Sequence, residues 1–339
     1  MSGGIYGGDD IGALDTRYFI GATEVNVPRE NCELKPYMHD CMVEDWDLFE
    51  QMMDYLAELM FEKYQVPSFF LVKNAVLTAF STGRSAGLVL DSGATYTSAT
   101  PVYDGYAITN AIVKSPVGGD LIVDQCRRVL EEQKIELVPY YKVQSKEEVK
   151  ENEAPIWTPK KNLPPLTKSY EDYMQKQLIE DFAHGTLQLC DSPIDMEFVE
   201  KLPADFLAER ARIPESLFDK KFIEGHELLK DAYMDTSHVA VTSCGMCDVD
   251  VRPHLYSNII VTGGNSLING YTERLNHDLA RRCNPTVKLR LPQCQPTERR
   301  YGAWIGGSIV SSLGSFQQLW ISKSEFEESG KALIDKRCM

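Results

Sequence analysis

A buried strand that ends in an acid, a hydroxyl and a glycine is the feature that most limits how this chain can fold. Residues 87–90 read GLVL, Asp91, Ser92 and Gly93 follow, and an alternating strand continues to residue 108. Such an ending points a carboxylate and a hydroxyl out of the sheet edge, and the glycine lets backbone N–H groups approach an anion. A carboxylate repels phosphate, so Asp91 would act through a divalent cation or its waters. The segment predicts either a phosphate-binding turn or an ordinary hairpin.

A second strand and turn, residues 256–282, have the same order of parts. The strand YSNIIVT is followed by Gly263 and Gly264, and a helix is predicted after them. The apolar side of that helix consists of Leu267, Ile268, Tyr271, Leu275 and Leu279. Free N–H groups at the start of the helix would suit a phosphate or the face of a base. Because such turns are common, neither one alone separates a nucleotide site from a hairpin.

Three further segments carry helix signals. Residues 46–64 place one apolar stripe at helical spacing and predict a core-facing helix. Residues 69–84 predict a strand that leads into a helix, which ends at Gly83. Residues 118–135 predict a helix with Asp120 as its N-cap. The apolar side of this last helix consists of Leu121, Val123, Cys126, Val129 and Leu130.

Turns and surface segments separate these elements. Residues 103–106, with the sequence YDGY, predict a tight turn between strands. Residues 142–170 combine mixed charge with four prolines and predict a surface excursion. Residues 301–330 predict an apolar strand or loop, then a helix from about Ser308, then an amphipathic end.

The composition excludes several classes of function. With 339 residues, 43% of them hydrophobic and 25% charged, the chain is long enough for two lobes. A formal net charge of −15 argues against clamping nucleic acid, which needs a basic face. No apolar run reaches the roughly 18 residues that span a bilayer, and the first residues do not resemble a signal peptide. We therefore expect no membrane partner.

The cysteines and the motif search point away from common chemistries. Nine scattered cysteines, an odd number, do not suggest a disulfide framework and suit a reducing compartment. Cys244 and Cys247 form a single CxxC, which we expect to consist of buried small residues rather than a zinc or redox site. Signatures of P-loop, zincin, α/β-hydrolase and dinucleotide-binding proteins are absent, and the six histidines sit apart.

Three motifs resemble those of actins and actin-related proteins, and they occur in the family's order. Residues 83–108 are similar to the second phosphate hairpin of actins, and residues 259–276 to the adenosine-contacting turn and helix. Residues 304–330, with the terminal KRCM, are similar to the actin C-terminus. The resemblance implies an α/β protein with the actin-like ATPase fold, in which two RNase-H-like lobes surround a nucleotide cleft.

Other segments narrow the resemblance to a subfamily. The stretches MSGGIYGGDDIGAL, VPREN, MVEDWD, IPESLFD and CGMCDVDVRP are similar to the nuclear actin-like subunit of BAF-type chromatin remodellers and related histone-acetyltransferase complexes. This resemblance implies an architectural subunit in the nucleus. Its implied partners are nuclear actin, the helicase-SANT-associated helix of the remodelling ATPase, other chromatin-complex subunits and, indirectly, the nucleosome.

The chain departs from the family pattern in its first lobe. After residues 12–14 the family has its first phosphate hairpin, where this sequence reads DTRYFIGATEVNVPREN. A strand, a loop and the start of a helix are missing between Tyr55 and Leu56, so the stripe at 46–64 would join two family helices. We therefore expect a truncated N-terminal lobe and a phosphate cradle without its opposing half. Each lost charge-assisted hydrogen bond lowers affinity about tenfold or more.

The resemblance implies a reduced set of nucleotide contacts. Those that survive are Asp91, Ser92, Gly93, Gly263, Gly264 and Arg300. Asn74 replaces the glutamine that orients the attacking water, and Ser98 replaces a histidine near that water. Ala94 replaces an aspartate near the metal, and Ala183 and His184 replace a Lys-Glu pair at the adenine. Hydrolysis needs an ordered water and a filled metal shell, so we expect no enzyme activity, no catalytic residue and no metal site. We also expect no bound cofactor, and the alternative is that the chain binds Mg-ATP.

The cleft that receives partner helices in actins is better retained. The matching positions are Phe80, Gly83, Ser85, Tyr106, Val310, Leu313 and Ser315. They are mostly apolar or small, which suits an amphipathic helix with anchors at i, i+3, i+4 and i+7. Phe80 and Leu313 also belong to apolar stripes, so burial in the core is the alternative for them.

These observations lead to one predicted organisation and three candidate functions. We predict residues 1–135 as a truncated N-terminal lobe with the second phosphate hairpin, residues 136–300 as a second lobe with the adenosine-type turn, and residues 301–339 as a segment that returns to the first lobe. The predicted function is that of a non-catalytic architectural subunit. The alternatives are a nucleotide-switched actin-fold ATPase and an unstable truncated isoform without function, since deleted strands expose sheet edges.

Overall fold

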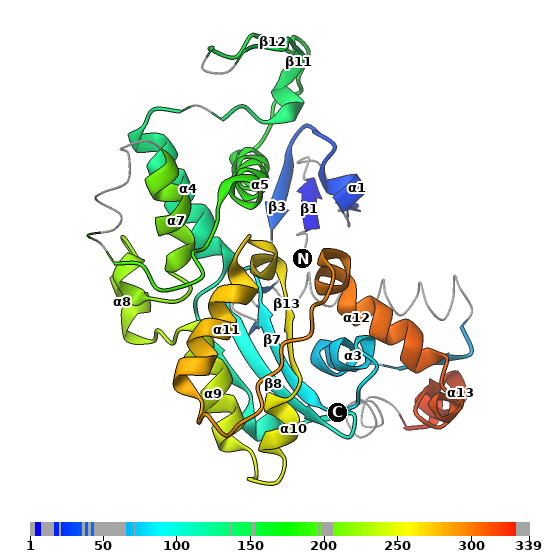
Figure 1. Cartoon of the computed structure of the whole chain (residues 1–339). Coiled ribbons are helices and arrows are strands. Elements are labelled where there is room, and N and C mark those ends of the chain that lie inside the picture. The colour runs from blue at the N-terminus through cyan, green and yellow to red at the C-terminus, as the bar shows by residue number, and fades with distance from the viewer. Residues whose placement is uncertain are drawn as a thin grey trace. The chain divides into compact units, whose positions relative to one another are not determined.

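The computed structural model divides the chain into two compact units (Figure 1). The small unit comprises Met1–Leu59 and Arg127–Ala183, and the large unit comprises Met60–Cys126 and His184–Met339. The structure describes residues 4–7, 17–19, 22–35, 38–39, 42–43, 66–70, 72–135, 137–150, 153–195, 197 and 206–329. The helix predicted over residues 46–64 and the terminal KRCM lie outside the described residues.

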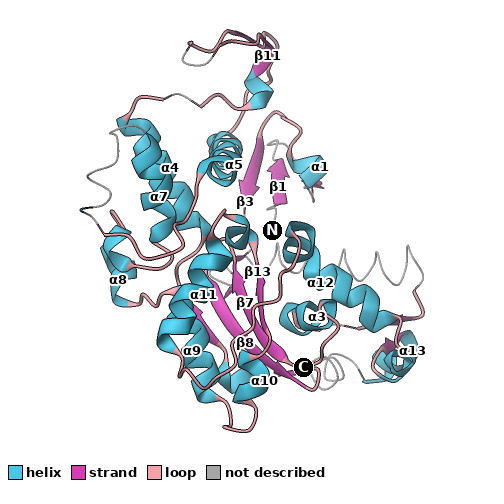
Figure 2. Cartoon of the chain, in the orientation of Figure 1, coloured by secondary structure: helices cyan, strands magenta, loops and turns pink. Residues whose placement is uncertain are grey.

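A mixed sheet forms the centre of the large unit. Its strand order is β10-β8-β7-β13, with β9 paired to β8. The strands are β7 (Gly87–Ser92), β8 (Thr97–Tyr103), β9 (Tyr106–Ala107), β10 (Val113–Ser115) and β13 (Ile259–Thr262). Leu88, Val89 and Leu90 are all buried, so both faces of β7 are covered. Figure 2 shows helices flanking these strands.

The pairing of β13 with β7 corrects the predicted lobes. These two strands run parallel, and Thr262 lies opposite Asp91. The Asp91 turn and the Gly263 turn therefore belong to one sheet, whereas the sequence predicts them in separate lobes, 1–135 and 136–300. The reason is that an apolar strand such as β7 needs a hydrogen-bonding neighbour on each edge, and the one beside it comes from a distant part of the chain.

Helices α3 (Asn74–Ser81) and α12 (Pro296–Ser311) pack closely against each other. α3 also covers the sheet in an apolar cluster that consists of Val76, Ala79, Val89, Val102 and Ile260. A Cβ atom at Gly306 would overlap the carbonyl oxygen of Leu77, so glycine permits this crossing. The predicted helix start near Ser308 is wrong, because Pro296 and a capping box between Gln295 and Glu298 begin the helix twelve residues earlier.

On the other side of the turn region, α11 (Tyr271–Arg282) packs against α9 (Thr236–Met246). The prediction that the Gly263 turn opens this helix is wrong. The turn leads into a short 3-10 segment, η5 (Gly264–Leu267), and α11 begins only after Gly270, whose φ is 83°. A side chain at Gly270 would overlap the carbonyl oxygen of Leu189, so the close approach of that loop sets the start of α11.

Helix α4 (Gly119–Glu132) buries the apolar side that the sequence predicted. Asp120 is its second residue and not its N-cap, which corrects the predicted boundary. The YDGY turn is confirmed, since Asp104 and Gly105 have φ values of 50° and 81° between β8 and β9. Gly83, with φ of 71°, ends α3 as predicted and donates its N–H to the carbonyl of Phe80 at 2.9 Å.

The small unit contains an antiparallel sheet in the order β2-β1-β3. Its helix α5 (Lys168–Thr186) is tied to β3 because Ser169 Oγ accepts the N–H of Leu34 at 3.0 Å, and Thr167 Oγ1 donates to the carbonyl of Cys32 at 2.6 Å. β11 and β12 form an exposed two-stranded ribbon, as expected of the surface excursion predicted over residues 142–170. The last part of that prediction is wrong, because Leu163 and Leu166 pack against the cluster that contains Tyr170, which is buried in the first turn of α5. The strands of this unit are β1 (Gly4–Gly7), β2 (Arg17–Phe19), β3 (Cys32–Lys35), β4 (Met38–His39), β5 (Met42–Val43), β11 (Val143–Lys146) and β12 (Trp157–Pro159).

Short elements complete the described chain. The small unit also has α1 (Ala22–Val25) and η3 (Tyr140–Lys142). The large unit adds β6 (Ser68–Phe69), η2 (Thr109–Ala111), α7 (Phe206–Glu215), η4 (Lys220–Phe222), α8 (Glu227–Asp231), α10 (Arg252–Tyr256), η6 (Gly314–Gln318), β14 (Ile321–Ser322) and α13 (Lys323–Ser329).

The α3–α12 crossing gives a stability prediction with a neighbouring control. Gly306→Ala forces the two helices apart, and we expect it to lower the free energy of unfolding by about 1–3 kcal/mol. At Gly307 a Cβ would lie 3.6 Å from Leu77 Cδ1, an ordinary contact, so Gly307→Ala should raise stability by up to about 1 kcal/mol. Urea unfolding followed by tryptophan fluorescence would measure both. Equal effects at the two positions would contradict the close crossing.

Candidate functional site

The Asp91 turn and the Gly263 turn lie side by side at the end of the central strands. Gly263 has a φ of 92°, and a Cβ placed on it would lie 2.5 Å from Asp91 Oδ1 and would overlap the carbonyl oxygen of Ser92. Only glycine fits this approach without displacing the facing turn. The structure thus brings together two segments that lie about 170 residues apart in the sequence, at Asp91–Gly93 and Gly263–Gly264.

Buried hydrogen bonds hold these two turns together. Asn265 Nδ2 donates to Ser92 Oγ at 3.1 Å and to the carbonyl of Gly93 at 2.8 Å. Ser92 Oγ also lies 3.1 Å from Thr97 Oγ1, which donates to the carbonyl of Val117 at 2.8 Å. The Ser92 hydroxyl is fully buried, so it acts here as a structural link between strands. Asn265 was not a predicted site residue, although its position one residue after the glycine pair could have identified it.

The N-terminus of α4 also bonds to the Asp91 turn. Gly119 donates its N–H to the carbonyl of Gly93 at 2.9 Å, and Asp120 donates its N–H to the carbonyl of Ala94 at 2.8 Å. A Cβ on Gly118 would overlap the carbonyl oxygen of Ala94, so the approach requires glycine. Two helix N–H groups that would otherwise face an anion are therefore taken up by the hairpin.

Asp91 is the charged group of this region. Its neighbours across the sheet are Ser98 on β8 and Thr262 on β13. Burial raises the pKa of the Asp91 carboxyl above its ordinary value, because the surroundings disfavour its charged form. A nearby cation would favour that charged form, which is the chemistry expected of a carboxylate that holds a divalent ion through water.

The adenosine-type turn contacts a different arginine from the predicted one. Arg300 is exposed, and its guanidinium lies 5.7 Å from the centre of the Tyr301 ring. Arg299 instead donates through Nη1 to the carbonyl of Ser266 and to Thr272 Oγ1, and its carbonyl accepts the hydroxyl of Thr262 at 2.7 Å. The capping box before Arg299 was the sequence signal that could have placed it in the first turns of a helix.

The altered family positions lie as follows. Asn74 is the first residue of α3, and its carbonyl accepts the hydroxyl of Thr78 at 2.9 Å. Ser98 is buried opposite Asp91 on β8. Ala183 and His184 belong to the last turn of α5, where Ala183 is buried and His184 is exposed.

Four of the predicted helix-binding residues gather around the YDGY turn. A Cβ on Gly105 would lie 3.2 Å from Phe80 Cζ, and Gly105 donates its N–H to the carbonyl of Ser85 at 2.8 Å. Gly83 follows the C-terminal end of α3, and Tyr106 is 71% exposed. This corner offers an aromatic side chain to solvent on a rigid turn.

The other three predicted residues lie at the end of α12. Val310 is buried and accepts, through its carbonyl, the N–H of Leu313 at 3.1 Å. Leu313 is 43% exposed, and Ser315 is exposed in η6. α12 packs on α3, so both groups lie on the same pair of packed helices in the large unit. Val310 is therefore a core residue, and Leu313 is the apolar side chain of these three that a partner helix can contact.

The remaining sequence expectations concern cysteines, metals and membranes. Cys244 and Cys247 are both buried, and burial raises the pKa of the Cys244 thiol to about 12. Within the described ranges, no group of three or more His, Cys, Asp or Glu side chains is placed to hold a metal ion. No helix in that same part of the chain is long and apolar enough to cross a membrane.

Two glycine-bearing turns joined across parallel strands, with helices on both faces of the sheet, define an α/β protein of the actin-fold class. The family model for actin matches residues 54–339, and the chain belongs to the actin family. It is 32% identical over 370 residues to actin-related protein 4 of Arabidopsis thaliana, covering 95% of this chain and 83% of that protein. Actin-related protein 4 of Yarrowia lipolytica is 32% identical over 364 residues, covering 95% and 84%. Actin-related protein 4 of Oryza sativa subsp. indica is 32% identical over 370 residues, covering 95% and 82%.

The buried carboxyl of Asp91 gives a prediction about pH. A raised pKa in the folded chain means that the folded state binds this proton more tightly than the unfolded state, so the stabilisation is present at low pH and is lost as pH rises through the folded pKa. Asp91→Asn keeps the shape and removes the charge. We expect this variant to melt at a higher temperature than wild type at pH 7.5, with the difference shrinking in acid.

Thermal melting of the two proteins between pH 5 and pH 8, without nucleotide or divalent ions, would measure this effect. Asp250→Asn, at an exposed loop position, is the matched control and should leave the melting temperature unchanged. A lower melting temperature for Asp91→Asn at neutral pH would contradict the assignment of a charge penalty to Asp91.

Proposed function

We propose that this actin-family chain is a non-catalytic architectural subunit of nuclear chromatin-remodelling and histone-acetyltransferase complexes. In this proposal it binds the helicase-SANT-associated helix of the remodelling ATPase together with nuclear actin, and contacts the nucleosome indirectly through other subunits. The similarity to proteins named actin-related protein 4 supports the assignment as an actin-related subunit. The complex and the partners are part of our proposal.

The observation that carries the proposal is a pair of exposed apolar side chains, one at the turn beside the C-terminal end of α3 and one after the end of α12. Tyr106 is 71% exposed on a turn anchored to Ser85, and Leu313 is 43% exposed directly after α12. Aromatic and aliphatic side chains on rigid supports are the usual anchors for an amphipathic helix. A partner helix that covers both would remove them from water without any rearrangement of the core.

The turn region supports a role without catalysis. The Ser92 hydroxyl, the Gly93 carbonyl and two N–H groups of α4 already have partners within the protein. Asn74 stands at the position where the family orients water, and Ala94 at the position of an acid near the metal. Hydrolysis of ATP needs both functions in the transition state, so we propose that this chain has no turnover.

A second candidate function is a nucleotide-switched subunit. The adjacent turns and the buried Asp91 carboxyl favour it, since a Mg-ATP complex would meet a carboxylate and two glycine turns in one place. In that case Mg-ATP would change the affinity for the partner helix.

The third candidate, an unstable truncated isoform, predicts that the purified chain melts without cooperativity.

Calorimetric titration of the full chain with the helicase-SANT-associated helix of the ATPase tests the proposal. We expect one-to-one binding that Leu313→Asp weakens at least thirtyfold, about 2 kcal/mol or more, because a charge would enter an apolar contact. Tyr106→Ala should weaken binding about tenfold. Leu228→Asp, at an 87% exposed leucine on α8, is the control that should bind as wild type does.

The same titration with Mg-ATP separates the candidates. An affinity that does not change with Mg-ATP supports the architectural function, and a shift of fivefold or more supports the switched one. Equal binding by wild type and Leu313→Asp would refute the surface. A chain that does not bind and melts without cooperativity would favour the unstable isoform.

A further inference from the structure

Two adjoining pockets lie in the large unit where α9 and α11 meet η4. The larger has a volume of about 450 Å³ and the smaller about 300 Å³. They share Phe218, Asp219 and Arg282, so they adjoin, and the two together are here named the Arg282 pocket. None of the predicted nucleotide-contact or helix-binding residues lines it.

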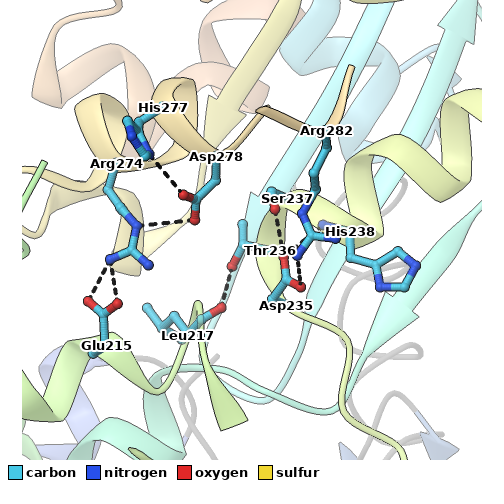
Figure 3. A network of polar contacts seen from close by, with 10 residues as sticks. All are labelled: Glu215, Leu217, Asp235, Thr236, Ser237, His238, Arg274, His277, Asp278 and Arg282. Atoms are coloured by element: carbon cyan, nitrogen blue, oxygen red, sulfur yellow. Dashed lines mark hydrogen bonds and ion pairs between the residues drawn. The ribbon is translucent and has the colours of Figure 1, made fainter. Parts of the chain in front are cut away.

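Donors of the protein contact the carboxylates of the Arg282 pocket, and Figure 3 shows these contacts at Asp235 and Asp278. Asp235 accepts from Arg282 Nη2 at 2.7 Å, from Ser237 Oγ at 2.6 Å and from the N–H of His238 at 2.9 Å. Asp278 accepts from Arg274 Nε at 3.1 Å, and Asp219 accepts the N–H of Lys221 at 3.0 Å. Arg282 thus balances the charge of Asp235, Arg274 is shared between Asp278 and the buried Glu215, and among the described residues the Asp219 carboxylate accepts only a neutral amide N–H.

The cationic side chains of the pocket are in the opposite situation. Lys220 and Lys221 line the larger part and Arg281 lines the smaller part. In the part of the chain that the structure describes, these three side chains have no hydrogen-bond or ion-pair partner. Arg282 lines both parts, is 43% exposed and uses one of its five N–H donors on Asp235. A chain of net charge −15 thus has a local excess of free positive charge here.

A buried hydroxyl provides an independent sign of a ligand. Tyr233 lines the larger part of the pocket, and its hydroxyl is buried without a hydrogen-bond partner among the described residues. Burial raises its pKa, so this group remains a donor at neutral pH. Buried polar groups in folded proteins nearly always have a partner, and an unpartnered phenolic donor on a residue that lines this pocket suits an anion oxygen.

We propose that the Arg282 pocket binds the phosphate groups of a small phosphorylated molecule, with a diphosphate as the preferred arrangement. Lysine ammonium groups, arginine guanidinium groups and a phenolic hydroxyl all donate to phosphate oxygens, and arginine can do so with two N–H groups at once. The two parts of the pocket, each with its own free cation, can each take one phosphate. This proposal does not depend on the architectural function.

Calorimetric titration of the full chain with pyrophosphate, at low ionic strength and without divalent ions, tests the site. We expect pyrophosphate to bind at one site and at least tenfold more tightly than inorganic phosphate, because it reaches both parts. Lys221→Ala and Arg281→Ala should each weaken pyrophosphate about tenfold. Lys288→Ala, an exposed lysine of the large unit outside the pocket, is the control and should bind as wild type does.

Tyr233→Phe gives a readout that a general loss of charge or of folding would not produce. Removing the unpartnered hydroxyl should leave the melting temperature of the ligand-free chain equal or higher, while the affinity for pyrophosphate falls severalfold. The absence of pyrophosphate binding at millimolar concentration would overturn the proposal. So would equal affinity in wild type and Lys221→Ala, or an equal loss in Lys221→Ala and Lys288→Ala.

Discussion

The parallel pairing of β7 with β13 is the interaction on which the rest of the large unit depends. It joins residues about 170 positions apart and places their following turns against each other, with Gly263 in contact with the Asp91 turn. The helices that follow these strands then have little freedom. α4 starts at the Asp91 turn, and α11 starts after the Gly263 turn.

The two turns are held together by hydrogen bonds of the protein itself. Asn265 bridges the two turns, and the carbonyls of Gly93 and Ala94 accept the N–H groups of the first two residues of α4. These hydrogen bonds stabilise the turns in the absence of a ligand. N–H groups that pointed into an empty anion site would have no partner and would not stabilise the turns in this way. Asp91 is the exception, since its burial leaves a charge that the protein bears at a cost.

Local signals in the sequence predicted local structure well. The strand before Asp91, the turn at residues 103–106, the end of α3 at Gly83 and the buried side of α4 follow from neighbouring residues alone, and the structure has them. The actin fold followed from motif resemblance. The predictions that were wrong depended on contacts between distant residues. These are the pairing of β13 with β7 and the start of α11, which the loop at Leu189 sets. The start of α12 was also missed, because glycines such as Gly302 and Gly306 disfavour a helix by composition alone.

The glycine crossing of α3 and α12 also determines how motion can pass through this part of the molecule. With Gly306 against the Leu77 backbone, neither helix can slide or rotate alone without a steric clash. α12 begins beside the Gly263 turn, through Arg299, and α3 ends at the YDGY corner, through Phe80. Between Arg299 and the crossing, however, α12 has a kink at Tyr301, where φ is −118° and ψ is 16°. The segment from Gly302 to Ser311 is therefore locked to α3, and Tyr301 is the point at which α12 can bend relative to the turn region.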